Sequence, residues 1–194
     1  MTVEEIFTKI SAHMIKGIMF HEQMSNYYDF LNLRGYKRCH EYHYICETVE
    51  YRKLQRYYIN CYNKLIPDSD IGNTSIIPTN WSRYTRQEVD GSTKRNAVKS
   101  GISEWIKWER ETRDLYADMY KELEKMNEVS AAAYICKLVC KVEKEIKHAE
   151  RKGIDLETVD YDMSVIVFAQ KKCTTNIFTN SEKWRLMYDK FRNH

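Results

Sequence analysis

Helix-breaking residues are scarce in this chain, because its 194 residues include only two prolines and six glycines. Proline and glycine are the residues that most often interrupt helices, so long helices are permitted along most of the sequence. Apolar residues also recur at helical spacing, from Ile6 through Ile10, Met14 and Ile18 to Leu31. The sequence therefore predicts an all-α fold.

Caps and turns set the expected helix boundaries. Thr2 and Glu5 form a capping box, Gly35 is expected to make the first helix–helix turn, and Ser130 is expected to cap a later helix that stops at Gly153. The expected long helices cover residues 3–33, 37–66, 93–126 and 130–152, and two shorter ones cover 161–172 and 181–192. We expect residues 1–152 to form a four-helix bundle and residues 153–194 to form a helical extension that packs on the bundle or on a partner subunit.

One long connection separates the second and third expected helices. Residues 67–92 are rich in turn and cap residues, and a structureless loop of that length is uncommon in a compact domain. A loop of this length can cross from one end of a bundle to the other, at up to about 3.3 Å per residue. The expected topology is therefore a four-helix bundle with one crossover connection.

Acidic residues on all four helices support the same topology. Glu145 and His148 lie one turn apart on one face of the fourth helix. At about 1.5 Å per residue they lie roughly 28 Å from the turn before their helix. Glu109 on the third helix lies at about the same distance from that turn. Glu22, Glu47 and Glu50 of the first hairpin lie roughly 20 Å from the turn between the first two helices. With a crossover, all of them reach one height along helices of about 46 Å. The candidate metal ligands are Glu22, Glu47, Glu50, Glu109, Glu145 and His148.

This arrangement resembles the ferritin-like superfamily, whose dinuclear metal site takes one Glu from each of two helices and Glu-x-x-His from the other two. Glu22 matches the single Glu of the first helix, and Glu109 in Trp108-Glu-Arg110 matches that of the third. Glu145 and His148 match the fourth-helix pair. The resemblance covers roughly residues 5–152 and implies two iron ions, or manganese, as cofactor, together with a homo-oligomeric assembly.

The second helix departs from the family pattern. It reads Glu47-x-x-Glu50 where the family has Glu-x-x-His. A carboxylate can replace an imidazole as a ligand for iron or manganese. His43, one turn before Glu47, is the alternative to Glu50 as the sixth ligand. His21 is expected on the surface or at an interface, and His40 with His43 forms a separate His-x-x-His pair that is a candidate for a surface metal site.

Composition excludes several other classes of protein. The net charge of +3 favours neither nucleic acid nor a membrane surface, and no apolar run is long enough to span a membrane. The six cysteines contain no Cys-x-x-Cys pair, which indicates reduced thiols in a cytoplasmic protein.

Two functions from different classes follow. The first is a dinuclear metal protein that oxidises Fe(II) with O2 or peroxide, or acts as a related oxidase at a carboxylate-bridged site. The alternative is a ferritin-like bundle without redox activity that serves as a binding or scaffold protein, for example one encoded by a phage or a mobile element.

Overall fold

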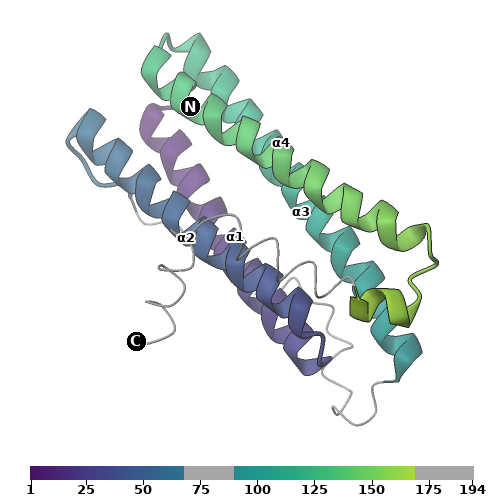
Figure 1. Ribbon diagram of the computed structural model, residues 1–194. Coiled ribbons are helices and arrows are strands. Elements are labelled where there is room, and N and C mark those ends of the chain that lie inside the picture. The colour runs from purple at the N-terminus through teal and green to yellow at the C-terminus, as the bar shows by residue number, and fades with distance from the viewer. Residues whose placement is uncertain (68–89, 169–194) are drawn as a thin grey trace.

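The computed structural model describes residues 1–67 and 90–168, and within these ranges it contains helices and no strands (Figure 1). The predicted helix over 181–192 and most of the 67–92 connection lie outside the described residues, and residues 163–168 form a short helix. The long helices are α1 (Val3–Phe30), α2 (Arg34–Tyr62), α3 (Gly91–Lys125) and α4 (Val129–Glu157). The all-α prediction is confirmed. Among the described helices, none has an apolar stretch long enough to cross a membrane.

The four long helices form two hairpins whose turns lie at opposite ends of the bundle. α1 packs along α2, and α3 packs along α4. In Figure 1 the α1–α2 turn is at the lower end and the α3–α4 turn is at the upper end. α2 therefore ends at the upper end, whereas α3 begins at the lower end. This is the crossover topology that the loop length and the positions of the glutamates predict.

The first helix begins at the predicted capping box, but the turn after it differs from the prediction. The Thr2 hydroxyl accepts a hydrogen bond from the Glu5 N–H at 3.2 Å, and the Glu5 carboxylate accepts one from the Thr2 N–H at 2.8 Å. The turn is made by Asn32, whose φ is 57°, and not by Gly35, which is buried inside α2. Asparagine adopts this left-handed conformation more readily than most residues, so the turn does not need the glycine.

Two other predicted boundaries are also wrong. α4 begins at Val129 with Glu128 as its N-cap residue, so Ser130 already lies within the helix. α4 also continues through Gly153 to Glu157. Gly153 is buried, and a Cβ at this position would lie 3.3 Å from Ile102 Cγ2 of α3. The glycine therefore permits the close approach of two helices and does not end one.

The bundle has two hydrophobic clusters, one toward each end. The upper core, toward the α3–α4 turn, consists of Ile6, Phe7, Ile10, Met14, Leu54, Tyr58, Ile66, Tyr116, Met119, Leu123, Ala131, Ala132, Ile135, Leu138, Val142 and Ile146. The lower core, toward the α1–α2 turn, consists of Phe20, Met24, Tyr27, Tyr28, Leu31, Leu33, Tyr36, Cys39, Ala97, Val98, Ile102, Trp105, Ala149, Leu156, Tyr161 and Ile166. The predicted metal ligands come from the middle turns of the helices, where these two cores meet.

Candidate functional site

Four glutamates from three helices line one small cavity at the lower edge of the upper core. Glu47 and Glu50 come from α2, Glu109 from α3 and Glu145 from α4. The cavity volume is about 20 Å³, which is about the room that one water molecule or ion needs. The remaining lining residues are Met14, Thr112, Tyr116, Leu138, Lys141 and Val142. The structure thus brings together four of the six residues that the sequence names as ligands.

Glu109 is the most deeply buried of these carboxylates, with 5 % of its surface exposed. Trp105, one turn earlier on α3, donates a hydrogen bond from its indole Nε1 to Glu109 Oε1 at 2.9 Å. Burial, together with the negative charges of Glu47 and Glu145, raises the pKa of Glu109 to about 7 against the opposing effects of His43 and Trp105. Too little positive charge surrounds Glu109 to offset its burial, so it keeps its proton at pH values at which an exposed glutamate is ionised.

The two glutamates of α2 differ in their surroundings. Desolvation raises the pKa of Glu47, and Glu50 and Glu145 add to this effect. Burial would also raise the pKa of Glu50, but the hydrogen bond from Lys53 at 2.8 Å and the charge of Lys141 lower it below its usual value. Glu50 therefore already has its counterions, whereas the charge of Glu47 is only partly balanced.

Lys141 of α4 supplies a positive charge inside this acidic group. Its ammonium lies 3.6 Å from Glu50 Oε1, and it lines the cavity. Burial would lower the pKa of Lys141, but Glu47 and Glu50 raise it above its usual value. The lysine is therefore charged, and its ammonium neutralises part of the negative charge that an external cation would otherwise neutralise.

A buried imidazole continues the site toward the lower core. His43 Nδ1 lies 3.9 Å from Glu145 Oε2. Burial alone would lower the pKa of His43, but its hydrogen bond with Cys39 and the charge of Glu145 raise it overall. His43 and His40 are only 6 % and 2 % exposed, so the expectation of a surface His-x-x-His site is wrong. His43, the alternative to Glu50 in the sequence, contacts a predicted ligand directly.

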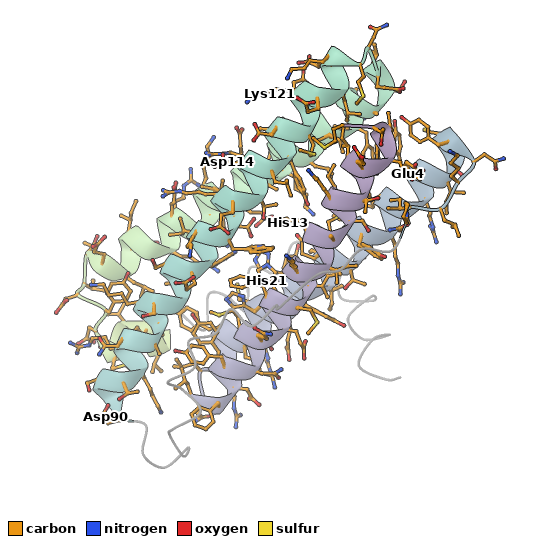
Figure 2. The ribbon with its side chains drawn as sticks, turned by 180° about the vertical axis from the view of Figure 1, so that it is seen from behind. Glu4, His13, His21, Asp90, Asp114 and Lys121 are labelled. Carbon is orange, nitrogen blue, oxygen red and sulfur yellow. The ribbon has the colours of Figure 1, made fainter. Side chains whose placement is uncertain are left out.

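The residue that α1 contributes is His21 and not its neighbour Glu22. His21 is 1 % exposed, and its Nε2 lies 4.0 Å from Glu109 Oε1, so its predicted surface position is wrong. In Figure 2 the labelled His21 lies on the side of α1 that faces α3. Glu22 is partly exposed and accepts a hydrogen bond from Asn26 Nδ2 at 3.3 Å. Glu22 is not part of the cavity lining.

His148 occupies the edge of the site. Its side chain is exposed, and its ring centroid lies 6.0 Å from that of Trp105. It does not line the acidic cavity, although Glu145 lies one turn before it on α4.

The side chains have the right chemistry for a cation but are not gathered around one point. Within residues 1–67 and 90–168, no three or more His, Cys, Asp or Glu side chains are placed so that they could hold a metal ion. The donor types nevertheless suit iron or manganese, which bind carboxylates and imidazole. The uncompensated charge at Glu47 and Glu109 also favours a cation. Binding would therefore require the glutamate side chains to rotate toward one another.

Known proteins resemble this chain in fold. No family model matches the sequence, and no curated protein matches it either. A humanized archaeal ferritin shares the fold with a TM-score of 0.73 at 11 % identity, over 89 % of this chain and 94 % of that one. An open-pore ferritin of the archaeon Archaeoglobus fulgidus gives a TM-score of 0.72 at 10 % identity, over 89 % and 95 % of the two chains. These likenesses show that the fold is ferritin-like, as the sequence predicts.

Proposed function

We propose that this ferritin-like bundle binds iron or manganese at the acidic cavity and oxidises Fe(II) with O2 or peroxide. The observation that carries the proposal is the convergence of Glu47, Glu50, Glu109 and Glu145 on one cavity inside the bundle. Ferritin-like proteins place their metal pair in the same part of the bundle, on inward-facing glutamates of all four helices. Fe(II) is the substrate of this reaction, and O2 or peroxide takes up the electron that each Fe(II) loses.

Each cavity residue has a role in this proposal. Glu47 and Glu109 bind the cation and lose their raised pKa when it neutralises them. Glu145 is the third ligand, and the adjacent imidazole of His43 orients it. Glu50 is the fourth ligand, and its ion pair with Lys141 must break before it can bind the cation. A second ion would need Glu22 and His148 to turn inward, so the full six-residue set stays a prediction.

Metal content tests the proposal directly. The chain expressed in iron-supplemented medium should retain about one or two iron or manganese ions, and the double variant Glu47→Gln with Glu109→Gln should retain none. Glu143→Gln, an exposed position on α4, is the matched control and should keep the metal. Fe(II) added without oxygen should then be oxidised on exposure to air faster by the wild type than by the double variant. Equal metal content in the wild type and the double variant would contradict the proposal.

One observation favours the second function, a bundle without redox activity. Lys141 already supplies a positive charge to Glu50, and the charges of Glu47 and Glu50 raise the pKa of Lys141 against the effect of its burial, as expected of a closed ion-pair network. In a scaffold protein, Lys141→Gln should destabilise the bundle, and no divalent cation should restore its melting temperature. In a metal protein, Mn(II) should restore the melting temperature of Lys141→Gln, because the bound ion replaces the positive charge that the substitution removes. The homo-oligomeric state and the cytoplasmic location stay predictions.

A further inference from the structure

A second group of potential ligands lies just below the acidic cavity. It consists of Cys39, His40 and His43 of α2 and His21 of α1, which we call the nitrogen–sulfur cluster. Their exposed fractions lie between 1 % and 6 %. Three imidazoles and a thiol in one buried layer are costly, because polar groups lose water when they are buried. The proposed carboxylate centre uses only His43 of this group, and only to orient Glu145.

The contacts within the cluster are close. The Nδ1 atoms of His21 and His40 lie 3.0 Å apart. The rings of His21 and His43 stack with their centroids 5.0 Å apart and an angle of 22° between the planes. Cys39 and His43 are one turn apart on α2 and hydrogen-bonded to each other. The spacings of three and four residues along α2 place His40, His43 and Cys39 around one side of the helix.

The thiol has a cation beside it. Lys152 Nζ of α4 donates a hydrogen bond to Cys39 Sγ at 3.1 Å. A positive charge next to a cysteine stabilises the thiolate, which is the form that binds metals. Two of the imidazoles are in the matching neutral state, because burial lowers the pKa of His40 to about 3, and burial together with the charges of His43 and His40 lowers that of His21. The pKa of His43 is raised instead, so a bound cation has to displace its proton. Neutral imidazole is the form that coordinates metals.

We propose that the nitrogen–sulfur cluster is a separate site for a soft or borderline cation of the zinc or copper(I) class. His21, His40 and His43 supply the nitrogens and Cys39 supplies the sulfur. Two nitrogens at about 2.0 Å from a tetrahedral zinc ion are roughly 3.3 Å apart, which is close to the 3.0 Å between the Nδ1 atoms of His21 and His40. Thiolate and imidazole select such ions over the harder ones that carboxylates prefer.

Closing the site takes a rearrangement of side chains. In the described residues the donors do not yet surround one point, so the cation has to draw Cys39 and His43 toward the His21–His40 pair. The layer is bounded by Trp105, whose ring centroid lies 5.3 Å from that of His40 and 4.9 Å from that of His43. Lys152 of α4 also contacts this indole, with its Nζ 5.1 Å from the ring centroid. The site therefore lies between all four helices.

Cobalt(II), a spectroscopic substitute for zinc, tests this proposal. The test starts from a background that keeps Cys39 and Cys46 and changes the other four cysteines to serine. Of these four, Cys61, Cys136 and Cys140 are exposed, and Cys173 lies outside the described residues. In that background Co(II) should give the near-ultraviolet band of a thiolate ligand and the strong visible bands of tetrahedral coordination. Cys39→Ser should abolish the thiolate band. Cys46→Ser, which changes another thiol of α2, should leave it intact.

Two further variants separate this site from the carboxylate centre. His40→Gln should weaken zinc binding by about tenfold or more, since even the loss of a residue that only supports a ligand costs that much. Glu47→Gln should leave the cobalt spectrum unchanged, although it removes iron or manganese. Absence of a thiolate band in the Cys46-containing background, or its persistence in Cys39→Ser, overturns the nitrogen–sulfur site while leaving the carboxylate proposal untouched. A cobalt spectrum without any iron or manganese binding would overturn the carboxylate proposal alone.

Discussion

The upper and lower cores are built from the same four helices, but they bury different kinds of side chain. Each buried histidine or carboxylate in the described part of the chain contacts the lower core or lies at its edge: His21, His40, His43 and Glu109. The hydrophobic side chains of the upper core are aliphatic residues, methionines and tyrosines, together with Phe7, and the buried polar residue Thr112 lies at its lower edge. The difference is one of composition and not of burial, since both cores include side chains without exposed surface.

This contrast separates the two tasks of the fold. Apolar burial in the upper core stabilises the bundle at about 25 cal/mol per Å². Buried ionisable groups in the lower core destabilise it unless a partner compensates them. Proteins tolerate such costs mainly at functional sites. The junction of the two cores and the layer just below it are therefore the place to look for function, and the rest of the upper core offsets the cost of the ionisable groups buried there.

The largest expected effect is the loss of a phenylalanine from either core. Phe7 has no exposed surface and its ring contacts that of Tyr58 at 5.0 Å between centroids, while Phe20, equally buried, contacts Trp108 at 5.5 Å and His21 at 5.1 Å. Either Phe→Ala change should cost about 3–5 kcal/mol, measured by urea denaturation. Only Phe20→Ala should also change the cobalt spectrum, because only Phe20 packs on the nitrogen–sulfur cluster. A spectral change in Phe7→Ala would show that the two cores are not independent.

The arrangement of the helices could be predicted because it depends on coarse features. Scarce glycine and proline, a long polar connection and level positions of the glutamates all specify one bundle topology, whatever the exact rotation of each helix. The ends of the helices were harder to predict, because more than one nearby residue can form the turn or the cap. Asn32 and Gly35 can both make a turn, and the sequence does not show that Gly35 fits inside α2.

Which residues face the site depends on how each helix is rotated about its own axis, and for α1 the face predicted from the sequence is wrong. The spacing Ile6, Ile10, Met14, Ile18 moves by four residues at each step, which turns the stripe by about 40° per step around a helix of 3.6 residues per turn. After four steps this drift reaches Glu22 and leaves the buried face. The observed stripe alternates steps of three and four residues, through Ile10, Met14, Gly17, His21, Met24 and Tyr28. Counting both spacings would have selected His21, which has the same sequence signal as the core residues around it.

The next largest effect concerns pH, and it tests whether the lower edge of the upper core is short of positive charge. The pKa of Glu109 is raised from 4.5 to about 7 in the folded chain. Its proton therefore stabilises the fold below about pH 4.5, and this contribution is lost as the pH rises through 7. With a chelator present, the stability of the wild type relative to Glu109→Gln should fall by about 3 kcal/mol between pH 4.5 and pH 8. Denaturant titrations at these two pH values measure the difference.

The same comparison has an internal control, because the two proteins share their histidines. His21 and His40 take up protons on unfolding as the pH falls below about 6.5, and this effect is common to the wild type and the variant. The pKa of His43 is raised partly by Glu109, so its contribution is part of the measured difference. A difference in stability that stays constant across the pH range would mean that Glu109 is ionised and well solvated in the fold.

The smallest expected effect sharpens the comparison within the lower core itself, at two glycines of neighbouring helices. A Cβ at Gly101 of α3 would overlap the Tyr28 hydroxyl and lie 2.9 Å from Met24 Cε, whereas a Cβ at Gly153 of α4 would meet only Ile102 Cγ2 at 3.3 Å and Ile106 Cδ1 at 3.7 Å. Gly101→Ala should therefore destabilise the bundle by about 1–3 kcal/mol through overpacking. Gly153→Ala should be close to neutral, because the gain in helix propensity of up to about 1 kcal/mol offsets a shift of the Ile102 side chain.

The position of Tyr28 gives these two variants different effects on the nitrogen–sulfur cluster. The Tyr28 ring stacks on His40 with centroids 5.4 Å apart and an angle of 23° between the planes. Displacement of Tyr28 in Gly101→Ala should therefore move His40 and weaken zinc binding, measured by competition with a chromophoric chelator. Gly153→Ala has no such contact and should bind zinc like the wild type. If both variants bound zinc equally well, His40 would not need the packing of the lower core, and its role as a ligand would lose its structural basis.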